Sequence, residues 1–396
     1  MKSLGHYWAL RYLTAGESHG PALTAILEGM AAGLPLTEET IAEDLARRQT
    51  GTGSGDRMAI ERDRAAILSG VMEGVTTGAP ITLQLVNRDH ANWKGKAVPA
   101  YTTPRPGHAD LAAAVKYGYT DIRPSLERAS ARETAARVAV GAVCRAFLKT
   151  FGITVDGYVS AINGHAACLE GMTFSDRVAR ARRSDVQCPD PEAAARIIAS
   201  IEQAKSQGET LGGIIDIVVE GVPVGLGSHV NWDRRLDARL AQAALGVPAI
   251  KGVEIGNAFS NTGKQGTQAH DAILPGSAGF ERRGDACGGI EGGISNGQPV
   301  WLRAAMKPIP TTRKGQDTVD LATGKPCLTY YERSDVCPVP RAVVVLEAVV
   351  AVAIADALME KLGGDSIAEM KPRFDTLRRA TLDDTRMSGQ PHTFWP

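Results

Sequence analysis

The chain of 396 residues has few aromatic residues and no net charge. Phe, Trp and Tyr make up 5% of it, and 44 lysines and arginines balance 44 aspartates and glutamates. Single-strand binders stack bases on aromatic side chains, and nucleic acid or an anionic lipid surface attracts a basic protein. The composition therefore argues against nucleic acid and membrane surfaces as partners. Any anion site has to come from basic residues that cluster locally.

Cysteine is also scarce. The six cysteines form no C-x-x-C pair, so neither a metal site nor a redox pair is predicted. Few cysteines in a long chain are typical of a reducing compartment. The first residues contain no apolar run long enough for a secretory signal. We therefore expect a cytoplasmic protein.

The sequence lacks a long apolar run that is free of charge. Residues 342–358 are very apolar, but Glu347 and Asp356 interrupt them. A charge inside a membrane span is costly, so this segment is predicted to be a helix buried in the core of a soluble protein.

Regular secondary structure is predicted along most of the chain. The patterns favour helices over residues 37–48, 130–151, 191–207, 233–245 and 338–362. They favour strands over residues 79–86, 213–220 and 299–306. Residues 94–108, 166–191 and 257–288 are rich in Gly, Pro or charge and are predicted to be long, functional loops.

One glycine pattern occurs twice with a constant offset. Each copy is a glycine-spaced loop that leads into a strand beginning with proline, and the matched positions are Gly70, Gly74, Gly78 and Pro80, then Gly289, Gly293, Gly297 and Pro299. Four matched positions favour a duplicated half over chance. We expect an α/β (α+β) fold with two similar halves, in which helices are packed between sheets.

Arginines cluster in short segments that also carry glycine or serine. These segments are residues 47–57, 105–110, 126–134 and 331–335. Surface arginines usually form weak ion pairs, but several such segments together favour a site for a polyanion. The glycine run in the first segment lacks the G-K-[ST] ending of a P-loop and follows no strand, which excludes a Rossmann fingerprint. Lys307, Thr311 and Thr312 follow a predicted strand and could hold a phosphate-bearing cofactor.

Two histidines stand beside glycines and acids. His19 lies in TAGESHG (residues 14–20), and His108 lies in RPGHAD (residues 105–110). Glycine lets the backbone approach a ligand closely, and histidine exchanges protons near neutral pH. From the residues alone we predict an α/β enzyme that acts on an anionic small molecule with two histidines as proton carriers. The reaction remains open at this point.

Five separated motifs, in order, resemble the chorismate synthase family. They are TAGESHG, RPGHAD, SLERASARET, the run from EGGISNGQP to MKPIPT, and ERSDVCPVP, and the resemblance extends from about residue 11 to residue 362. It implies a β-α-β sandwich with internal pseudo-symmetry and a homotetramer. We expect one domain over residues 1–396, with halves of roughly 11–210 and 211–362 and a tail at 363–396.

The resemblance also implies the reaction. The family converts 5-enolpyruvylshikimate-3-phosphate (EPSP) to chorismate and phosphate by a 1,4-anti elimination, which leads to the aromatic amino acids. There is no net redox change, yet reduced FMN is required. NADPH is a possible reductant for the flavin, although no nicotinamide motif is visible, which favours an external reductase.

Matching positions assign site residues by resemblance. The catalytic residues would be His19, which protonates the departing phosphate, His108, which serves the reduced flavin, and Asp335 near the flavin's reactive end. FMN-binding positions are Arg128, Ala129, Ser130, Pro248, Ala249, Gly292, Lys307, Pro308, Ile309, Pro310, Thr311 and Arg333. Substrate- or NADP-binding positions are Arg48, Ser54 and Arg132.

The chain departs from the family pattern at two places. Ser54 stands where relatives carry a second arginine, which removes a charge from the anion site unless Arg57 compensates. Pro248 replaces an asparagine, so it has neither an amide hydrogen nor a side-chain donor. Two alternatives therefore stay open: a flavin-dependent oxidoreductase with net hydride transfer, and a non-enzymatic anion-binding protein.

Overall fold

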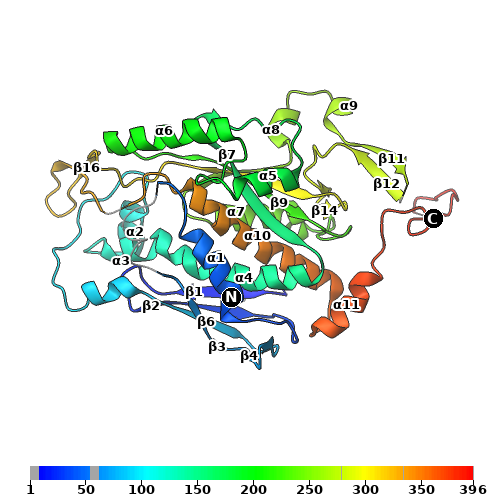
Figure 1. Cartoon of the computed structure of the whole chain (residues 1–396), viewed down its shortest axis with the longest axis horizontal. Helices are drawn as coiled ribbons and strands as arrows, with labels where there is room; N and C mark the ends of the chain where they lie inside the picture. Colours follow the sequence, from blue (N-terminus) through cyan, green and yellow to red (C-terminus); the bar gives the residue numbers. More distant parts are fainter. Residues whose placement is uncertain (1–8, 54–61, 278, 333, 396) are drawn as a thin grey trace.

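The computed structural model describes residues 9–53, 62–277, 279–332 and 334–395. Ser54, Arg57 and Arg333, which the sequence singles out, lie outside the described residues. The described chain is a mixed α+β structure with several antiparallel sheets, and its main helices lie between the two largest sheets (Figure 1).

The first sheet has four antiparallel strands. Its order is β1 (Arg11–Ala15), β2 (Ala22–Glu28), β6 (Ile81–Val86) and β3 (Ala65–Ser69). Alternate residues of β6, namely Ile81, Leu83 and Leu85, are fully buried. Successive side chains of a strand point to opposite faces, so this alternation turns one face of the sheet into the core.

The second sheet contains five antiparallel strands. Its order is β10 (Ile250–Ile255), β15 (Val300–Met306), β9 (Gly213–Glu220), β7 (Thr154–Ile162) and β8 (His165–Ala166). The three strands predicted from the sequence are confirmed as β6, β9 and β15. Because β7 pairs with β9 in this sheet, the division expected between residues 210 and 211 would cut through the sheet.

Four helices fill the space between the sheets: α1 (Glu38–Arg48), α4 (Thr134–Thr150), α7 (Leu236–Leu245) and α10 (Val339–Leu362). Helices α4 and α10 pack on each other; α4 also covers β2 and β6, and α10 covers β7 and β9 (Figure 1). All four helices were predicted. The side chain of Thr37 caps α1 by accepting a hydrogen bond from the amide of Thr40.

Helix α10 is long and apolar enough to cross a membrane, but its most apolar stretch of 18 residues is entirely buried inside the protein. Two of its carboxylates, Glu347 and Asp356, have no exposed surface and are paired. Glu347 accepts hydrogen bonds from Arg47 and Arg145, and Asp356 is bound to Arg239. The prediction of a buried core helix is confirmed, because cations on neighbouring helices neutralise the charges that interrupt it.

The remaining elements surround this core. They include the helices α2 (Asp110–Tyr117), α3 (Arg123–Arg128), α6 (Pro191–Gln207) and α11 (Ile367–Asp375), and the short 3-10 helices η2 (Arg88–Asn92), η3 (Ala131–Glu133) and η4 (Trp232–Arg234). Two predicted loops were wrong in part. Residues 166–191 contain α5 (Phe174–Ala181), and residues 257–288 contain α8 (Ala258–Asn261), α9 (Gly266–Ala269), β11 (Ala272–Gly276) and β12 (Gly279–Arg283).

Helix α5 was missed although it carries a local start signal. Thr173 and Asp176 form a capping box, in which each side chain binds the backbone amide of the other residue. The surrounding charge and glycine obscured this signal in the sequence.

The two copies of the glycine pattern form matching hairpins. Strands β4 (Val71–Met72) and β5 (Val75–Thr76) precede β6, and strands β13 (Ile290–Glu291) and β14 (Ile294–Ser295) precede β15. Both turn residues have positive φ in each copy: 51° and 78° at Glu73 and Gly74, and 58° and 85° at Gly292 and Gly293. This is the geometry of a type I′ turn, which explains why glycine recurs there. A third hairpin, β16 (Asp317–Val319) and β17 (Pro326–Leu328), lies apart from these.

Candidate active site

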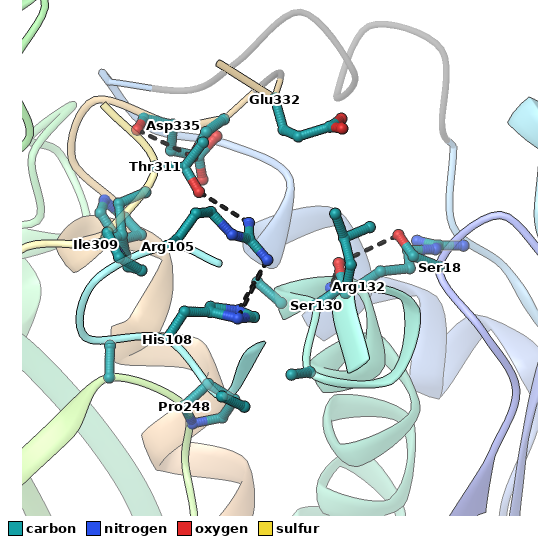
Figure 2. Close-up of a pocket in the computed structure, with 18 of the residues that line it drawn as sticks. Ser18, Arg105, His108, Ser130, Arg132, Pro248, Ile309, Thr311, Glu332 and Asp335 are labelled. Carbon is teal, nitrogen blue, oxygen red and sulfur yellow. Dashed lines mark hydrogen bonds between the residues drawn. The ribbon is translucent and has the colours of Figure 1, made fainter. Parts of the chain in front are cut away.

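A cavity of about 710 Å³ brings together segments that are far apart in the sequence (Figure 2). Its lining combines the loop after β1, the segment from the end of α3 through η3, the loop 105–109, the turn before β10 and the loop after β15. Among the described residues, six basic side chains and three acidic ones line it: Arg48, Lys96, Arg105, Arg132, Lys307 and Arg341, with Asp89, Glu332 and Asp335. The cavity therefore has the excess of positive charge that an anionic ligand requires.

Most of the predicted site residues line this cavity. They are His19, Arg48, His108, Ala129, Ser130, Arg132, Pro248, Ala249, Lys307, Ile309, Pro310, Thr311 and Asp335. In the described part of the chain, three predicted residues do not line it: Arg128, Gly292 and Pro308. Ser54 and Arg333 lie outside the described residues.

Arg128 is directed away from the cavity. Its Nη2 donates to the carbonyl oxygen and the hydroxyl of Thr14, both at 2.8 Å, and its Nη1 donates to the carbonyl oxygen of Gly16 at 3.1 Å. The guanidinium therefore holds the TAGESHG loop in place. Gly292 occupies the type I′ turn between β13 and β14, where its positive φ explains the glycine.

His19 is bound at both its ring and its backbone by one carboxylate. Nδ1 of His19 lies 2.7 Å from Oε1 of Glu127, and the amide of His19 donates to Oε2 at 2.7 Å. The ring also packs on Trp93, with a distance of 4.2 Å between the ring centroids. Burial alone would raise the pKa of Glu127, but the hydrogen bonds from His19 hold this pKa below its usual value. Glu127 is therefore an ionised acceptor at neutral pH.

His108 has a similar carboxylate partner. Nδ1 of His108 lies 2.5 Å from Oδ1 of Asp110, a side chain with no exposed surface. Arg105 donates from Nε to Oδ2 of Asp110 at 2.8 Å and from Nη1 to the hydroxyl of Thr311 at 3.0 Å (Figure 2). Burial alone would raise the pKa of Asp110, but hydrogen bonds from His108 and Arg105 hold it well below its usual range.

Two arginines of the cavity share one buried carboxylate. Nη1 of Arg132 donates to Oδ1 of Asp63 at 2.6 Å, and Nη1 of Arg48 lies 3.5 Å from Oδ2 of Asp63. Nε of Arg132 also donates to the side chain of Asn87 at 2.8 Å. Burial lowers the pKa of Arg48 to about 10, because it opposes the charged form more than Asp63 supports it. Arg48 is still a cation at neutral pH.

The lining of the cavity also contains Asp335 and Arg341. Nη1 of Arg341 donates to Oδ2 of Asp335 at 2.9 Å. Burial lowers the pKa of Arg341, although the Asp335 carboxylate acts against this shift. Nη2 of Arg341 is buried and makes no hydrogen bond within the described residues. A buried donor without a partner is costly, so this atom is suited to an anionic group of a ligand.

Part of the lining is apolar and could contact a flat ring system. Leu126, Ala129, Met306, Ile309 and Pro338 contribute aliphatic surface next to the basic groups. A flavin mononucleotide has an apolar ring system and an anionic phosphate, and this combination of aliphatic and cationic lining fits both parts.

Several residues of the site were missed as site residues by the sequence analysis. Arg105 and Asp110 lie inside RPGHAD, and Glu127 lies beside Arg128, so the motifs already contained them. Nothing in the sequence pointed to Lys96 or Arg341, which enter the cavity only because their elements pack around it.

Comparisons with known proteins agree with this site. The chorismate synthase family model matches residues 10–359. Proteins named chorismate synthase from Geobacter metallireducens and Desulforamulus reducens are both 54% identical to this chain, and each match covers 92% of it and 98% or 97% of the relative. A crystal structure of chorismate synthase superposes with a TM-score of 0.76 at 43% identity, over 92% of this chain and 96% of that one.

The family model spans most of the chain, the relatives match it over nearly their whole length, and the motifs that carry the resemblance line one cationic cavity. This chain belongs to the chorismate synthase family.

Proposed function

We infer that the protein converts EPSP to chorismate and phosphate by 1,4-anti elimination. The observation that supports this activity is the cavity itself, in which six basic side chains surround two histidines that each bind a carboxylate. EPSP carries two carboxylates and a phosphate, and guanidinium groups bind such anions through paired hydrogen bonds. The flavin-dependent oxidoreductase and the non-enzymatic binding protein have no comparable support.

Arg48 and Arg132 are the proposed anchors of the substrate anions. Both are almost completely buried in the cavity wall and are held by Asp63, so their side chains need little ordering when an anion binds. Arg341 adds the buried Nη2 donor. Together these groups would fix the phosphate in place and stabilise the charge that develops as it leaves.

His19 is the proposed acid for the leaving phosphate. In the elimination, the C–O bond to phosphate breaks, and the phosphate takes the electron pair and one proton while the substrate ring loses another proton. An imidazolium in a site that excludes water is suited to supply the first proton. His19 lines the cavity and is fixed by Glu127, which supports this role.

Reduced FMN is the proposed cofactor, and its bound ring system would lend electron density to the substrate as phosphate departs. The residues that would hold it are Ser130, Ala129, Lys307, Thr311 and the aliphatic wall around Pro248 and Ile309. His108, fixed by Asp110, lies on this side of the cavity and would keep a proton next to the flavin (Figure 2). Asp335 would orient Arg341. The hydrogen bonds of Arg128 support a role in fixing the TAGESHG loop, and not a direct contact of Arg128 with the flavin.

Anaerobic turnover tests this function. Purified protein is mixed with EPSP and a small amount of chemically reduced FMN, and chorismate and phosphate are followed together. Many equivalents of both products for each flavin, with no matching loss of reductant, are expected. Consumption of reductant in proportion to product would support the oxidoreductase, and flavin binding without any product would refute the elimination.

Further proposals concern the organisation of the protein. We propose one domain over residues 1–396 with two pseudo-symmetric halves, because the orders β1-β2-β6-β3 and β7-β9-β15-β10 correspond strand by strand and α4 and α10 follow equivalent strands. This correspondence supports a boundary between α4 and β7, with the tail at 363–396 outside the repeat. The homotetramer follows from the resemblance, the cytoplasmic location from the scarcity of cysteine, and the reduction of the flavin by an external reductase, and not by its own NADPH reaction, from the lack of a visible nicotinamide motif in the sequence. Light scattering and NADPH oxidation assays test these points.

A further inference from the structure

Glu127 binds His19 at two points, whereas an ordinary ion pair joins only the two side chains; we call this double contact the Glu127 clasp. One carboxylate oxygen binds the ring nitrogen and the other binds the amide of the same residue, both at 2.7 Å. The amide of the preceding residue, Ser18, donates to the carbonyl oxygen of Glu127 at 3.2 Å. A single residue at the end of α3 therefore sets both the backbone position and the side-chain rotamer of His19.

This clasp also determines which ring nitrogen carries a proton. The ionised carboxylate of Glu127 can only accept a hydrogen bond, so Nδ1 of His19 has to be the donor. In the neutral ring Nε2 is then the unprotonated nitrogen, and in the charged ring Nε2 carries the exchangeable proton. Within the part of the chain that the structure describes, Nε2 of His19 has no recorded hydrogen bond, and the ring lines the cavity.

Two further contacts hold His19, one at its ring and one at its backbone. Trp93 packs on one side of it, and Nδ1 of His90 lies 2.9 Å from the carbonyl oxygen of His19. A ring flipped about its Cβ–Cγ bond would place Cδ2 against Glu127, because the flip exchanges Nδ1 with Cδ2 and Nε2 with Cε1. Such a flip would have to break the 2.7 Å contact and leave the carboxylate without its ring partner.

We propose that Glu127 is a positioning residue that keeps His19 in the Nδ1–H form and directs Nε2 at the leaving phosphate. This inference rests on the proposed function, because it assigns the nitrogen through which the proposed acid works. Asp110 has a similar relation to His108, but Asp110 also binds the side chain and the amide of Arg105. Glu127 is therefore the residue at which the positioning role can be separated from the fold.

Histidine labelled with ¹⁵N gives a readout that does not need turnover. The His19 signal is identified by its loss in His19→Gln, at a pH high enough to leave the ring neutral. The wild-type ring is expected to show protonated Nδ1 and unprotonated Nε2, and Glu127→Gln is expected to populate both tautomers. A wild-type His19 that is protonated on Nε2 would overturn the proposal.

Single-turnover rates complete the test, because they can be followed for hours in slow variants. Glu127→Gln is expected to lower the rate by about 10- to 100-fold, which is less than the roughly 100- to 10,000-fold that the acid itself contributes, because His19 is still present. In the His19→Gln background the same change is expected to alter the rate less than about twofold, since there is no acid left to position. An equal loss in both backgrounds would mean that Glu127 does not act through His19.

Glu133→Gln is the matched control. Glu133 is a buried carboxylate near Glu127 in the sequence, but it binds Thr14 and Arg137 and does not touch His19. Its substitution is expected to have the same effect in both backgrounds. If the wild-type protein shows no turnover at all, the proposed function fails, whereas the tautomer measurement still decides the role of Glu127.

Discussion

A close contact between the two central helices leads to a prediction that is opposite to the one from helix propensity alone. Gly141 in α4 faces Ala348 in α10, and a Cβ added to Gly141 would lie closer than 3.0 Å to Cβ, Cα and the carbonyl oxygen of Ala348. Carbon atoms in contact normally stay about 3.5–4.0 Å apart. Because two of these three atoms belong to the backbone, no side-chain rotation can relieve the overlap. Gly141→Ala must push the helices apart.

The magnitude follows from two opposing effects. An extra carbon in a packed core costs about 1–3 kcal/mol, and contact with backbone places this site at the upper end. Replacing glycine by alanine in a helix interior stabilises the helix by about 1 kcal/mol. A net loss of about 2 kcal/mol remains. With an unfolding entropy of about 2.1 cal/mol/K per residue over 396 residues, it corresponds to a fall in Tm of about 2–3 °C.

Thermal unfolding followed by circular dichroism, at one protein concentration, measures this effect. Gly266→Ala is the matched control, because its added Cβ would meet no atom within 4 Å, and its Tm is expected to stay the same or rise slightly. Adding Ala348→Gly to Gly141→Ala is not expected to restore the Tm, because the Cα of Ala348 remains too close. A Gly141→Ala protein that melts at or above the wild-type temperature would refute the reasoning.

Three further predictions concern charges at the site. Asp110→Asn lowers the free energy of unfolding at neutral pH, and urea titrations should show the difference from wild type shrinking below about pH 4. A carboxylate whose pKa is lower in the folded state stabilises the protein fully above its unfolded-state pKa, and this stabilisation is lost as the pH falls toward the folded-state pKa. A constant difference would contradict this. Asp63→Asn leaves Arg48 and Arg132 without their shared carboxylate and costs about 3 kcal/mol, so inorganic phosphate should raise its Tm more than that of wild type. Ser54→Arg restores the positive charge that relatives carry at this position and should lower the KM for EPSP about tenfold, which corresponds to about 1.4 kcal/mol of binding free energy. Ser54→Gln should leave the KM unchanged, and equal KM values for both variants would argue against a missing charge.

The secondary structure around the core could be predicted because its signals are local. Helix α6 and strand β9 begin and end at the predicted residues, since a proline or glycine marks their ends and the apolar period lies within them. Helix α5 was missed because a single capping box is a weak signal among charged residues. The pairing of β7 with β9 could not be read from the repeated glycine pattern, because it is a long-range contact.

The sequence by itself determined the family, the central helices and the two histidines in glycine-bearing loops, because motifs and periodicity are properties of neighbouring residues. Only the tertiary structure decided which side chains meet. It brought Arg341 to the cavity, turned Arg128 onto the TAGESHG loop, and placed Glu127 on both ring and amide of His19. The hydrogen bonds among these contacts join residues more than 100 positions apart in the sequence. Which groups pair over such a separation depends on how whole helices and sheets pack.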